Sequence, residues 1–259
     1  MYMNENLYEI DTNKFETEIF CTFENGRSLK TFIYKPKNWS ILNKQKSIIF
    51  FHGGGFKIGS PERFYPQALH FSSKGYIVFV PEYRIESKDG TGAFEATKDA
   101  HYFFEWVIQN SSKFKINQKR IILGGGSAGG QLAASIANIS LNKNKNLPKP
   151  VALILYNPAI NIPPKGKIKD DYFRDYFKDP AKGSLINFPP CIIMHGTNDK
   201  VIPFSWISNF VDKLNMKSLD CVFEVYHNKD HGFYNKNISN EDYLNTNKQI
   251  KLFLDNRGI

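Results

Sequence analysis

The sequence predicts an α/β fold in which helices flank one mostly parallel sheet. From residue 46, short apolar runs rich in β-branched and aromatic residues alternate with longer helical patterns, as in parallel sheets. The first two strand-like runs are joined by the sequence Glu-Asn-Gly-Arg at 24–27, in which Asn-Gly favours an antiparallel hairpin. With 259 residues, 41% of them hydrophobic, the chain can bury one large core, so we expect a single domain over 1–259.

Eight strands and five helices follow from these patterns. The expected strands are 16–23, 29–34, 47–51, 76–80, 120–123, 151–156, 191–194 and 222–226. The expected helices are 65–73, 93–110, 128–141, 205–214 and 241–255. Between 157 and 190 the periodicity gives way to scattered prolines, with aromatic residues between Tyr172 and Phe177. We expect this stretch to be an excursion over the carboxyl edge of the sheet that forms part of a substrate pocket or a small lid.

Charge and composition exclude several classes of partner. The formal net charge of +9 comes largely from lysines spread singly among asparagines, with no basic helix face or nucleic-acid recognition motif, so no nucleic-acid partner is expected. No run of about 18 apolar residues occurs, and the first residues lack the pattern of a signal peptide. The three cysteines have neither metal nor redox spacing. These features predict a soluble, cytoplasmic protein without membrane contact, unless a secretion signal has been trimmed, and they leave the oligomeric state open.

A serine stands on a glycine-dense turn between a strand and a helix. The sequence Gly-Gly-Ser-Ala-Gly at 125–129 fits the Gly-x-Ser-x-Gly pattern, in which small neighbours let the hydroxyl of a strained turn stand clear of the sheet. The helix that follows directs its amino end, which favours negative charge, to the same point. An ordinary or phosphate-binding turn is the alternative, but the Lys-Ser/Thr of a P-loop is missing. We predict that Ser127 is the nucleophile.

A second glycine cluster follows the expected strand 47–51. The sequence His-Gly-Gly-Gly-Phe at 52–56 lets the backbone approach a carbonyl under attack, whose oxyanion needs two or three N–H donors. We predict that Gly54, Gly55 and Ala128, the residue after the nucleophile, form this oxyanion hole. His52 is expected to hydrogen-bond within its loop and not to transfer protons.

The nucleophile needs a base, and the base needs an acid that orients it. Of the six histidines, His231 fits the base best because it lies in the loop between the last expected strand and the last expected helix, with His227 as the runner-up. Asp199 follows strand 191–194, where its carboxylate could accept the imidazole N–H. An aspartate in an ordinary surface turn is the alternative reading of Asp199.

Together these motifs resemble the α/β-hydrolase superfamily, and within it the hormone-sensitive-lipase-like and bacterial acetylesterase group. The resemblance runs from about residue 15 to the end of the last helix, and it rests on His-Gly-Gly-Gly-Phe at 52–56, Gly-Gly-Ser-Ala-Gly-Gly at 125–130, Asp199, and His-Gly-Phe at 231–233. It implies the eight-stranded α/β-hydrolase sheet and a triad in the chain order Ser127, Asp199, His231. No metal or organic cofactor is expected, since neither a ligand cluster nor a nucleotide fingerprint accompanies the triad.

Two departures from the family pattern point away from the hormone-sensitive-lipase-like subgroup. Gly126 stands where hormone-sensitive-lipase-like proteins usually carry aspartate, and the 51 residues ahead of His52 hold strands in place of a helical cap. The sequence Pro-Glu-Tyr-Arg at 81–84 and the stretch 90–99 look more like compact esterases, often linked to polysaccharide breakdown, that remove acyl groups from carbohydrates. We therefore expect no large cap domain, and a serine carboxylesterase that cleaves short acyl esters of small molecules or oligosaccharides through an acyl-enzyme.

Three other functions remain to be weighed. A peptidase of the prolyl-oligopeptidase type shares the Gly-Gly-Ser turn and the His-Gly-x-x-Asp turn at 195–199, but it normally carries a large extra domain for which this chain has no room. An arylformamidase-like amide hydrolase would use the same triad and stays an alternative. A non-catalytic binding protein on the same scaffold would typically have lost a member of the triad, and all three are present.

Overall fold

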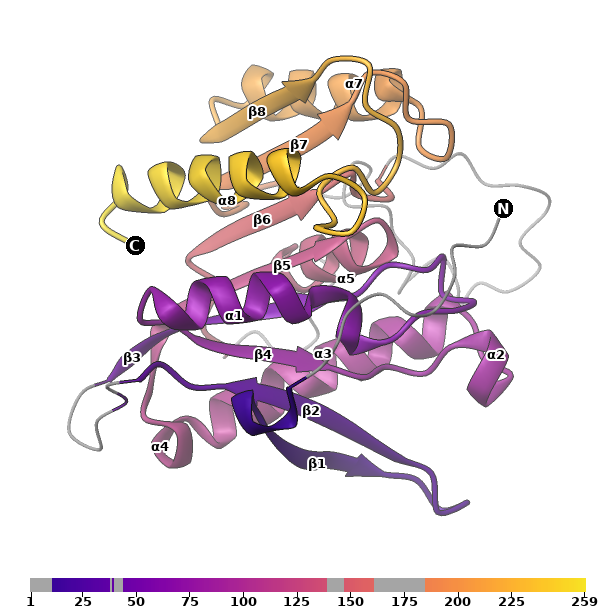
Figure 1. Cartoon of the computed structure of the whole chain (residues 1–259), viewed down its shortest axis with the longest axis vertical. Helices are drawn as coiled ribbons and strands as arrows, with labels where there is room; N and C mark the ends of the chain where they lie inside the picture. Colours follow the sequence, from indigo (N-terminus) through magenta and orange to yellow (C-terminus); the bar gives the residue numbers. More distant parts are fainter. Residues whose placement is uncertain (1–10, 38, 40–43, 139–146, 161–184) are drawn as a thin grey trace.

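The structure is a computed structural model of the chain, and it describes residues 11–37, 39, 44–138, 147–160 and 185–259. Its strands form one eight-stranded sheet in the order β1-β2-β4-β3-β5-β6-β7-β8 (Figure 1). The strands are β1 (Glu16–Thr22), β2 (Ser28–Tyr34), β3 (Gln45–Phe51), β4 (Ile77–Pro81), β5 (Ile116–Gly126), β6 (Ala152–Tyr156), β7 (Cys191–Gly196) and β8 (Cys221–Tyr226). The predicted eight strands are confirmed.

Only the first part of the sheet is antiparallel. β1 pairs with β2 through the expected hairpin, whose Gly26 has a φ of 82°, and β2 pairs antiparallel with β4. Every pairing from β4 through β3, β5, β6 and β7 to β8 is parallel. The carboxyl ends of these parallel strands therefore meet along one edge, which is where such folds place their functional loops.

Helices cover both faces of the sheet. α1 (Tyr65–Ser73) and α8 (Asn240–Asp255) lie on the face turned to the viewer in Figure 1, and α3 (Ala93–Gln109), α5 (Ala128–Ala137) and α7 (Phe204–Met216) pack on the other. Successive side chains of a strand point to opposite faces of the sheet. Ile48 and Phe50 pack in the core under α1 and α8, whereas Ile49 and Phe51 pack in the core under α3, α5 and α7. Burial on both faces explains why the central strands read as unbroken apolar runs.

The structure differs from the sequence expectations mainly at element ends. The helix expected over 128–141 ends at Ala137, because Asn138 has an extended backbone, and residues 139–146 lie outside the described residues. β5 begins at Ile116, four residues early, where the polar sequence Asn-Gln-Lys masks the strand pattern. The single-turn helices α2 (Glu86–Asp89) and α4 (Ser111–Phe114) are too short to show a period.

Two other expectations concern the surface of the fold. Most of the excursion predicted over 157–190 falls in residues 161–184, including the aromatic stretch 172–177, and so lies outside the described residues. Across the described ranges, every helix is too short or too polar to traverse a lipid bilayer.

Candidate active site

The predicted site residues come together at the carboxyl edge of the sheet. Ser127 follows β5, the loop 52–58 follows the neighbouring β3, Asp199 follows β7, and His231 follows β8. A pocket of about 510 Å³ is lined by residues of these loops, among them Gly53, Gly54, Gly55, Ser127, Asn157 and His231. Strands far apart in the sequence thus deliver the nucleophile, the base and the glycine loop to one cavity.

Ser127 has the strained backbone expected of a nucleophile held on a sharp turn. Its φ of 53° and ψ of −118° are unfavourable for a residue with a side chain. The turn is held by three backbone hydrogen bonds: the Ser127 N–H donates to the Tyr156 carbonyl at 2.9 Å, and the Ser127 carbonyl accepts from Ala159 at 2.9 Å and from Gln131 at 3.1 Å. These bonds to β6 and α5 place the serine side chain in the pocket.

The glycine before the nucleophile has a packing reason. A Cβ atom on Gly126 would lie 1.8 Å from the Tyr234 hydroxyl oxygen, so no larger residue fits without moving that ring. Tyr234 is buried and stacks on Tyr156 at a centroid distance of 4.4 Å. The space that an aspartate would need at position 126 is therefore filled by an aromatic side chain from the loop before α8.

The glycine loop after β3 requires glycine for its path. Gly54 has a φ of 133°, and a Cβ there would lie 1.7 Å from the Ile58 carbonyl oxygen. His52 supports the loop from below: its Nδ1 donates to the Gly53 carbonyl at 2.9 Å, and Tyr83 donates to the His52 carbonyl at 2.7 Å. Burial lowers the pKa of His52 to about 3, so the ring is neutral at neutral pH. His52 thus bonds within its loop, as expected.

Three backbone N–H groups at this edge have no acceptor among the described residues. They belong to Gly54, Gly55 and Ala128, the residues predicted to form the oxyanion hole. The Ala128 N–H is the first of α5, and the first N–H groups of a helix have no partner inside it. The site therefore offers donors to a developing negative charge without breaking a bond already made.

His231 and Asp199 are joined by a short hydrogen bond. His231 Nδ1 lies 2.8 Å from Asp199 Oδ2, while Asp199 Oδ1 accepts from the Val201 N–H at 2.9 Å and from the Ile202 N–H at 2.8 Å. The carboxylate is buried and held on both oxygens, so the imidazole that it binds is held as well. His227, the alternative base, is exposed and is not the histidine that reaches Asp199.

A second histidine stabilises the aspartate loop. His195 is fully buried at the end of β7, and its Nε2 donates to the Ile202 carbonyl at 2.9 Å and lies 3.6 Å from Asp199 Oδ2. Burial lowers the pKa of His195, which favours the neutral ring. The histidine of the His-Gly-x-x-Asp turn thus ties the two ends of the Asp199 loop together.

Asn157 is a site residue that the sequence analysis missed. It follows β6, is fully buried, and has a positive φ of 32°. Its Nδ2 lies 3.3 Å from His231 Nε2, and its Oδ1 accepts from the Gly232 N–H at 3.1 Å. Because Nδ1 of His231 faces a carboxylate and carries the proton, Nε2 is the acceptor. In the structure this nitrogen bonds Asn157 and makes no hydrogen bond with Ser127.

Asn157→Ala is expected to lower kcat/KM for a short ester by about tenfold, with most of the loss in kcat. The substitution removes two hydrogen bonds that hold His231 and its loop, so the base would spend less time in the reactive orientation. Asn187→Ala is the matched control, because Asn187 also has a positive φ, 59°, but is exposed outside the pocket. A folded Asn157→Ala protein with kcat/KM within about twofold of wild type would contradict this role.

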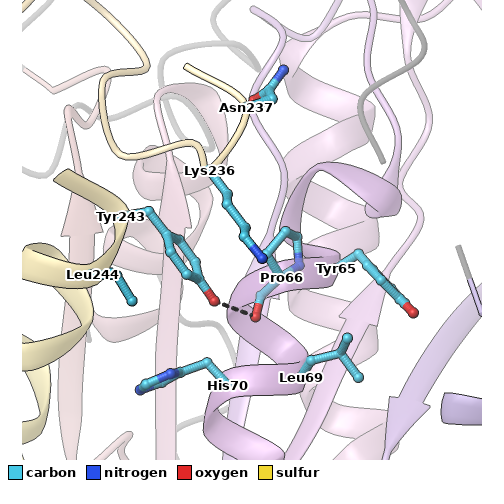
Figure 2. A pocket seen from close by; sticks show the side chains of 8 residues that line it. All are labelled: Tyr65, Pro66, Leu69, His70, Lys236, Asn237, Tyr243 and Leu244. Atoms are coloured by element: carbon cyan, nitrogen blue, oxygen red, sulfur yellow. Dashed lines mark hydrogen bonds between the residues drawn. The ribbon is translucent and has the colours of Figure 1, made fainter. Parts of the chain in front are cut away.

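A larger hollow, of about 710 Å³, lies away from these residues between α1 and α8. Figure 2 shows Tyr243 of α8 reaching across to α1, where its hydroxyl donates to the Pro66 carbonyl at 2.9 Å, with Lys236 alongside. None of the predicted site residues lines it. Among the described residues, no three His, Cys, Asp or Glu side chains are grouped as metal ligands would be, and the expectation of catalysis without metal or cofactor stays a prediction.

The strand order and the position of these loops at one edge of the sheet are those of an α/β-hydrolase fold. A family profile described as alpha/beta hydrolase fold matches residues 48–181, more than half of the chain, and the chain belongs to this family. The resemblance inferred from the motifs is thereby confirmed. A second profile, described as the prolyl oligopeptidase family, matches residues 165–253, the part that carries Asp199 and His231.

Solved structures of esterase 2 from Thermogutta terrifontis are similar over nearly the whole chain. Its form phosphorylated by paraoxon is 28% identical, with a TM-score of 0.86, and the match covers 96% of both chains. Its butyrate-bound form is 27% identical, with a TM-score of 0.82 and 95% of both chains covered. The chain therefore shares the fold of that esterase over nearly the whole length of both proteins.

Curated relatives are matched only in part, and the chain spans between 21% and 58% of the lengths of the first five. Lipase 2 of a Moraxella species is 34% identical over 95 residues, which are 36% of this chain and 21% of that protein. Ethyl acetate hydrolase of Pseudomonas putida is 23% identical over 55% of this chain and 44% of its own. Endo-1,4-beta-xylanase B of Butyrivibrio fibrisolvens is 22% identical over 78% of this chain and 34% of its own.

Proposed function

We propose that this protein is a serine carboxylesterase in which Ser127 is the nucleophile, His231 the general base and Asp199 the residue that orients the base. The observation that carries the proposal is the pocket in which a serine on a strained turn lies with a histidine bonded to a buried aspartate. Such a pair activates a hydroxyl that is otherwise a weak nucleophile. The esterase activities named for similar proteins support the same reaction.

The geometry supports a two-step reaction. His231 Nε2 takes the Ser127 proton as Oγ attacks the ester carbonyl, and the N–H groups of Gly54, Gly55 and Ala128 hold the oxyanion. The protonated His231, stabilised by Asp199, then gives its proton to the leaving alcohol, which leaves an acyl-enzyme. Water attacks the acyl group with the same proton transfers, and the acid and free Ser127 are released.

Short acyl esters are the substrate class that we favour. Butyrate and propionate are bound in structures of the Thermogutta esterase, and the Pseudomonas relative is named for ethyl acetate. For the alcohol part we favour acetylated sugars or oligosaccharides. The resemblance to compact carbohydrate esterases supports this choice, and so does the partial similarity to a xylanase. The aromatic residues at 172–177, which could pack against sugar rings, lie outside the described residues.

A chain-length series of chromogenic esters tests the acyl preference. We expect kcat/KM to be highest for acetyl or propionyl esters and to collapse by octanoyl. A long acyl pocket would instead contribute up to about 0.8 kcal/mol per buried methylene, so that kcat/KM would climb with chain length.

The same protein is then assayed for acetate release from acetylated glycans. A maximum at eight carbons or longer, together with no acetate from any glycan, would overturn the carbohydrate esterase while leaving the triad in place. Matching anilides belong in the series because of the partial match to the prolyl oligopeptidase profile. Faster cleavage of the anilide than of the ester would favour an amide hydrolase.

A further inference from the structure

The pocket that holds Ser127 is lined by more positive than negative side chains. Lys57, Arg63 and Lys200 line it, and Asp230 is the one carboxylate in the described lining. Asp230 is already engaged, because its Oδ1 accepts from the N–H groups of Lys200 at 3.0 Å and His231 at 2.7 Å. These two backbone bonds lower the pKa of Asp230, so it is ionised at neutral pH without cancelling the three cations.

The two lysines at the rim have partners and extend into solvent. Lys57 Nζ lies 4.0 Å from Glu86, and Lys200 Nζ lies 3.7 Å from Asp230, with 67% and 83% of these lysine side chains exposed. Exposed ion pairs of this kind contribute little to the stability of the fold, and they do not fix the position of the lysine ammonium group. The lysines raise the local potential, but neither is held in place to recognise a particular group.

Arg63 differs from both lysines. It lies in the short 3-10 helix Pro61–Phe64 that follows the glycine loop, and it is half-buried. Its side chain makes no hydrogen bond or ion pair with any other described residue. The remaining arginines of the described ranges all donate to the protein: Arg27 to Asp89, Arg84 to Asp99, Arg120 to the Gly258 carbonyl and Arg257 to Asp220.

The charge of Arg63 reaches the base of the oxyanion loop. Burial lowers the pKa of His52 most, the hydrogen bond with Gly53 opposes this, and the positive charge of Arg63 lowers the pKa further. Burial raises the pKa of Tyr83 beneath the same loop, and the charge of Arg63 opposes that rise. A guanidinium in a partly enclosed pocket loses hydration, and here it gains no compensating partner from the part of the chain that the structure describes. A planar group with paired N–H donors at such a position matches a carboxylate, which it can bind with two parallel hydrogen bonds.

We propose that Arg63 binds a carboxylate of the substrate, so that the enzyme selects esters that carry an anionic group. The inference rests on the proposed esterase function and makes it more specific: the ester would belong to an acidic molecule, such as a glycan that contains uronic acid. The carboxylate could belong to the alcohol part or to the acyl part of the ester. The formal charge of +9 would also favour the approach of anionic molecules over neutral ones.

Two matched pairs of esters test the proposal at neutral pH. In the first pair, 4-acetoxybenzoate and its methyl ester differ only in a carboxylate on the alcohol part. In the second, mono-4-nitrophenyl succinate and 4-nitrophenyl butyrate differ in a carboxylate on the acyl part. For the pair with the correct placement we expect wild-type kcat/KM to favour the anionic ester by about tenfold or more, the size of a charge-assisted hydrogen bond.

Arg63→Gln should reduce that anionic-to-neutral ratio of kcat/KM by about tenfold, and Arg63→Lys, which keeps the charge but loses the planar fork, should retain part of it. Lys213→Gln is the matched control, because it removes one positive charge from the exposed face of α7 and should leave the ratio unchanged. Thermal unfolding of each variant checks that it is folded.

The outcomes separate the two proposals. A wild-type ratio near one for both pairs, or an equal ratio in wild type and Arg63→Gln, would overturn the role of Arg63 while the esterase stands. No hydrolysis of any of the four esters by the folded wild-type protein would overturn the esterase itself, and the role of Arg63 with it.

Discussion

Ser127→Ala is expected to lower kcat/KM for a short acyl ester by about 10⁴- to 10⁶-fold. The hydroxyl oxygen is the atom that forms the acyl-enzyme, and no neighbouring group in the pocket can replace it. The fold should survive, because the Ser127 hydroxyl makes no hydrogen bond with any residue that the structure describes and the turn is held by backbone bonds that alanine retains. Initial rates over a range of ester concentrations, with thermal unfolding as a check of folding, measure the effect.

A covalent probe gives an independent test of the same residue. Paraoxon phosphorylates the similar Thermogutta esterase, so we expect one phosphoryl group on the wild-type protein, located at Ser127 by mass spectrometry of its peptides. Ser127→Ala should remain unlabelled, whereas Ser205→Ala, which changes an exposed serine on α7, should be labelled and fully active. A folded Ser127→Ala protein that kept a tenth of wild-type activity would show that the nucleophile lies elsewhere. A wild-type protein that stayed unlabelled would favour a binding protein.

The second large effect is expected at the base and its partner. His231→Ala should approach the loss seen for Ser127→Ala, and Asp199→Asn should lose somewhat less, about 10⁴-fold. The aspartate substitution is informative because the asparagine oxygen can still accept from Val201 and Ile202. Its amide nitrogen would then face His231 Nδ1 donor to donor, which drives the proton to Nε2 and removes the acceptor that Ser127 needs.

When residues act as one catalytic unit, removing a second member costs little further activity once the first has been removed. The double variant Ser127→Ala/His231→Ala should therefore be about as slow as either single variant, and the logarithms of the losses should not add. His227→Ala is the control, since it removes an exposed histidine close in sequence that is not the one bonded to Asp199. Additive losses, or a severe effect at His227 with none at His231, would require another base.

Much of the fold is already present in local sequence patterns. The eight strands are recognisable because central parallel strands are buried on both faces and so read as apolar runs, as in Ile48 to Phe51. The first hairpin follows from Asn25-Gly26, whose backbone conformation few other pairs adopt easily. The positions of Ser127, Asp199 and His231 after β5, β7 and β8 also follow from chain order, because parallel strands present their carboxyl ends at one edge.

The sequence by itself thus determined which segments form strands and helices. It also singled out Ser127, Asp199 and His231, because few other residues could take the roles predicted for them. The tertiary structure alone decided that β4 lies between β2 and β3, because strand order depends on packing between distant segments. It also decided that Tyr234 fills the space beside Gly126, that Asn157 contacts His231 and that Arg63 has no partner among the described residues. Each of these features depends on how residues from different strands and loops lie relative to one another. No local period or motif encodes such a relation, because it exists only once the chain has folded.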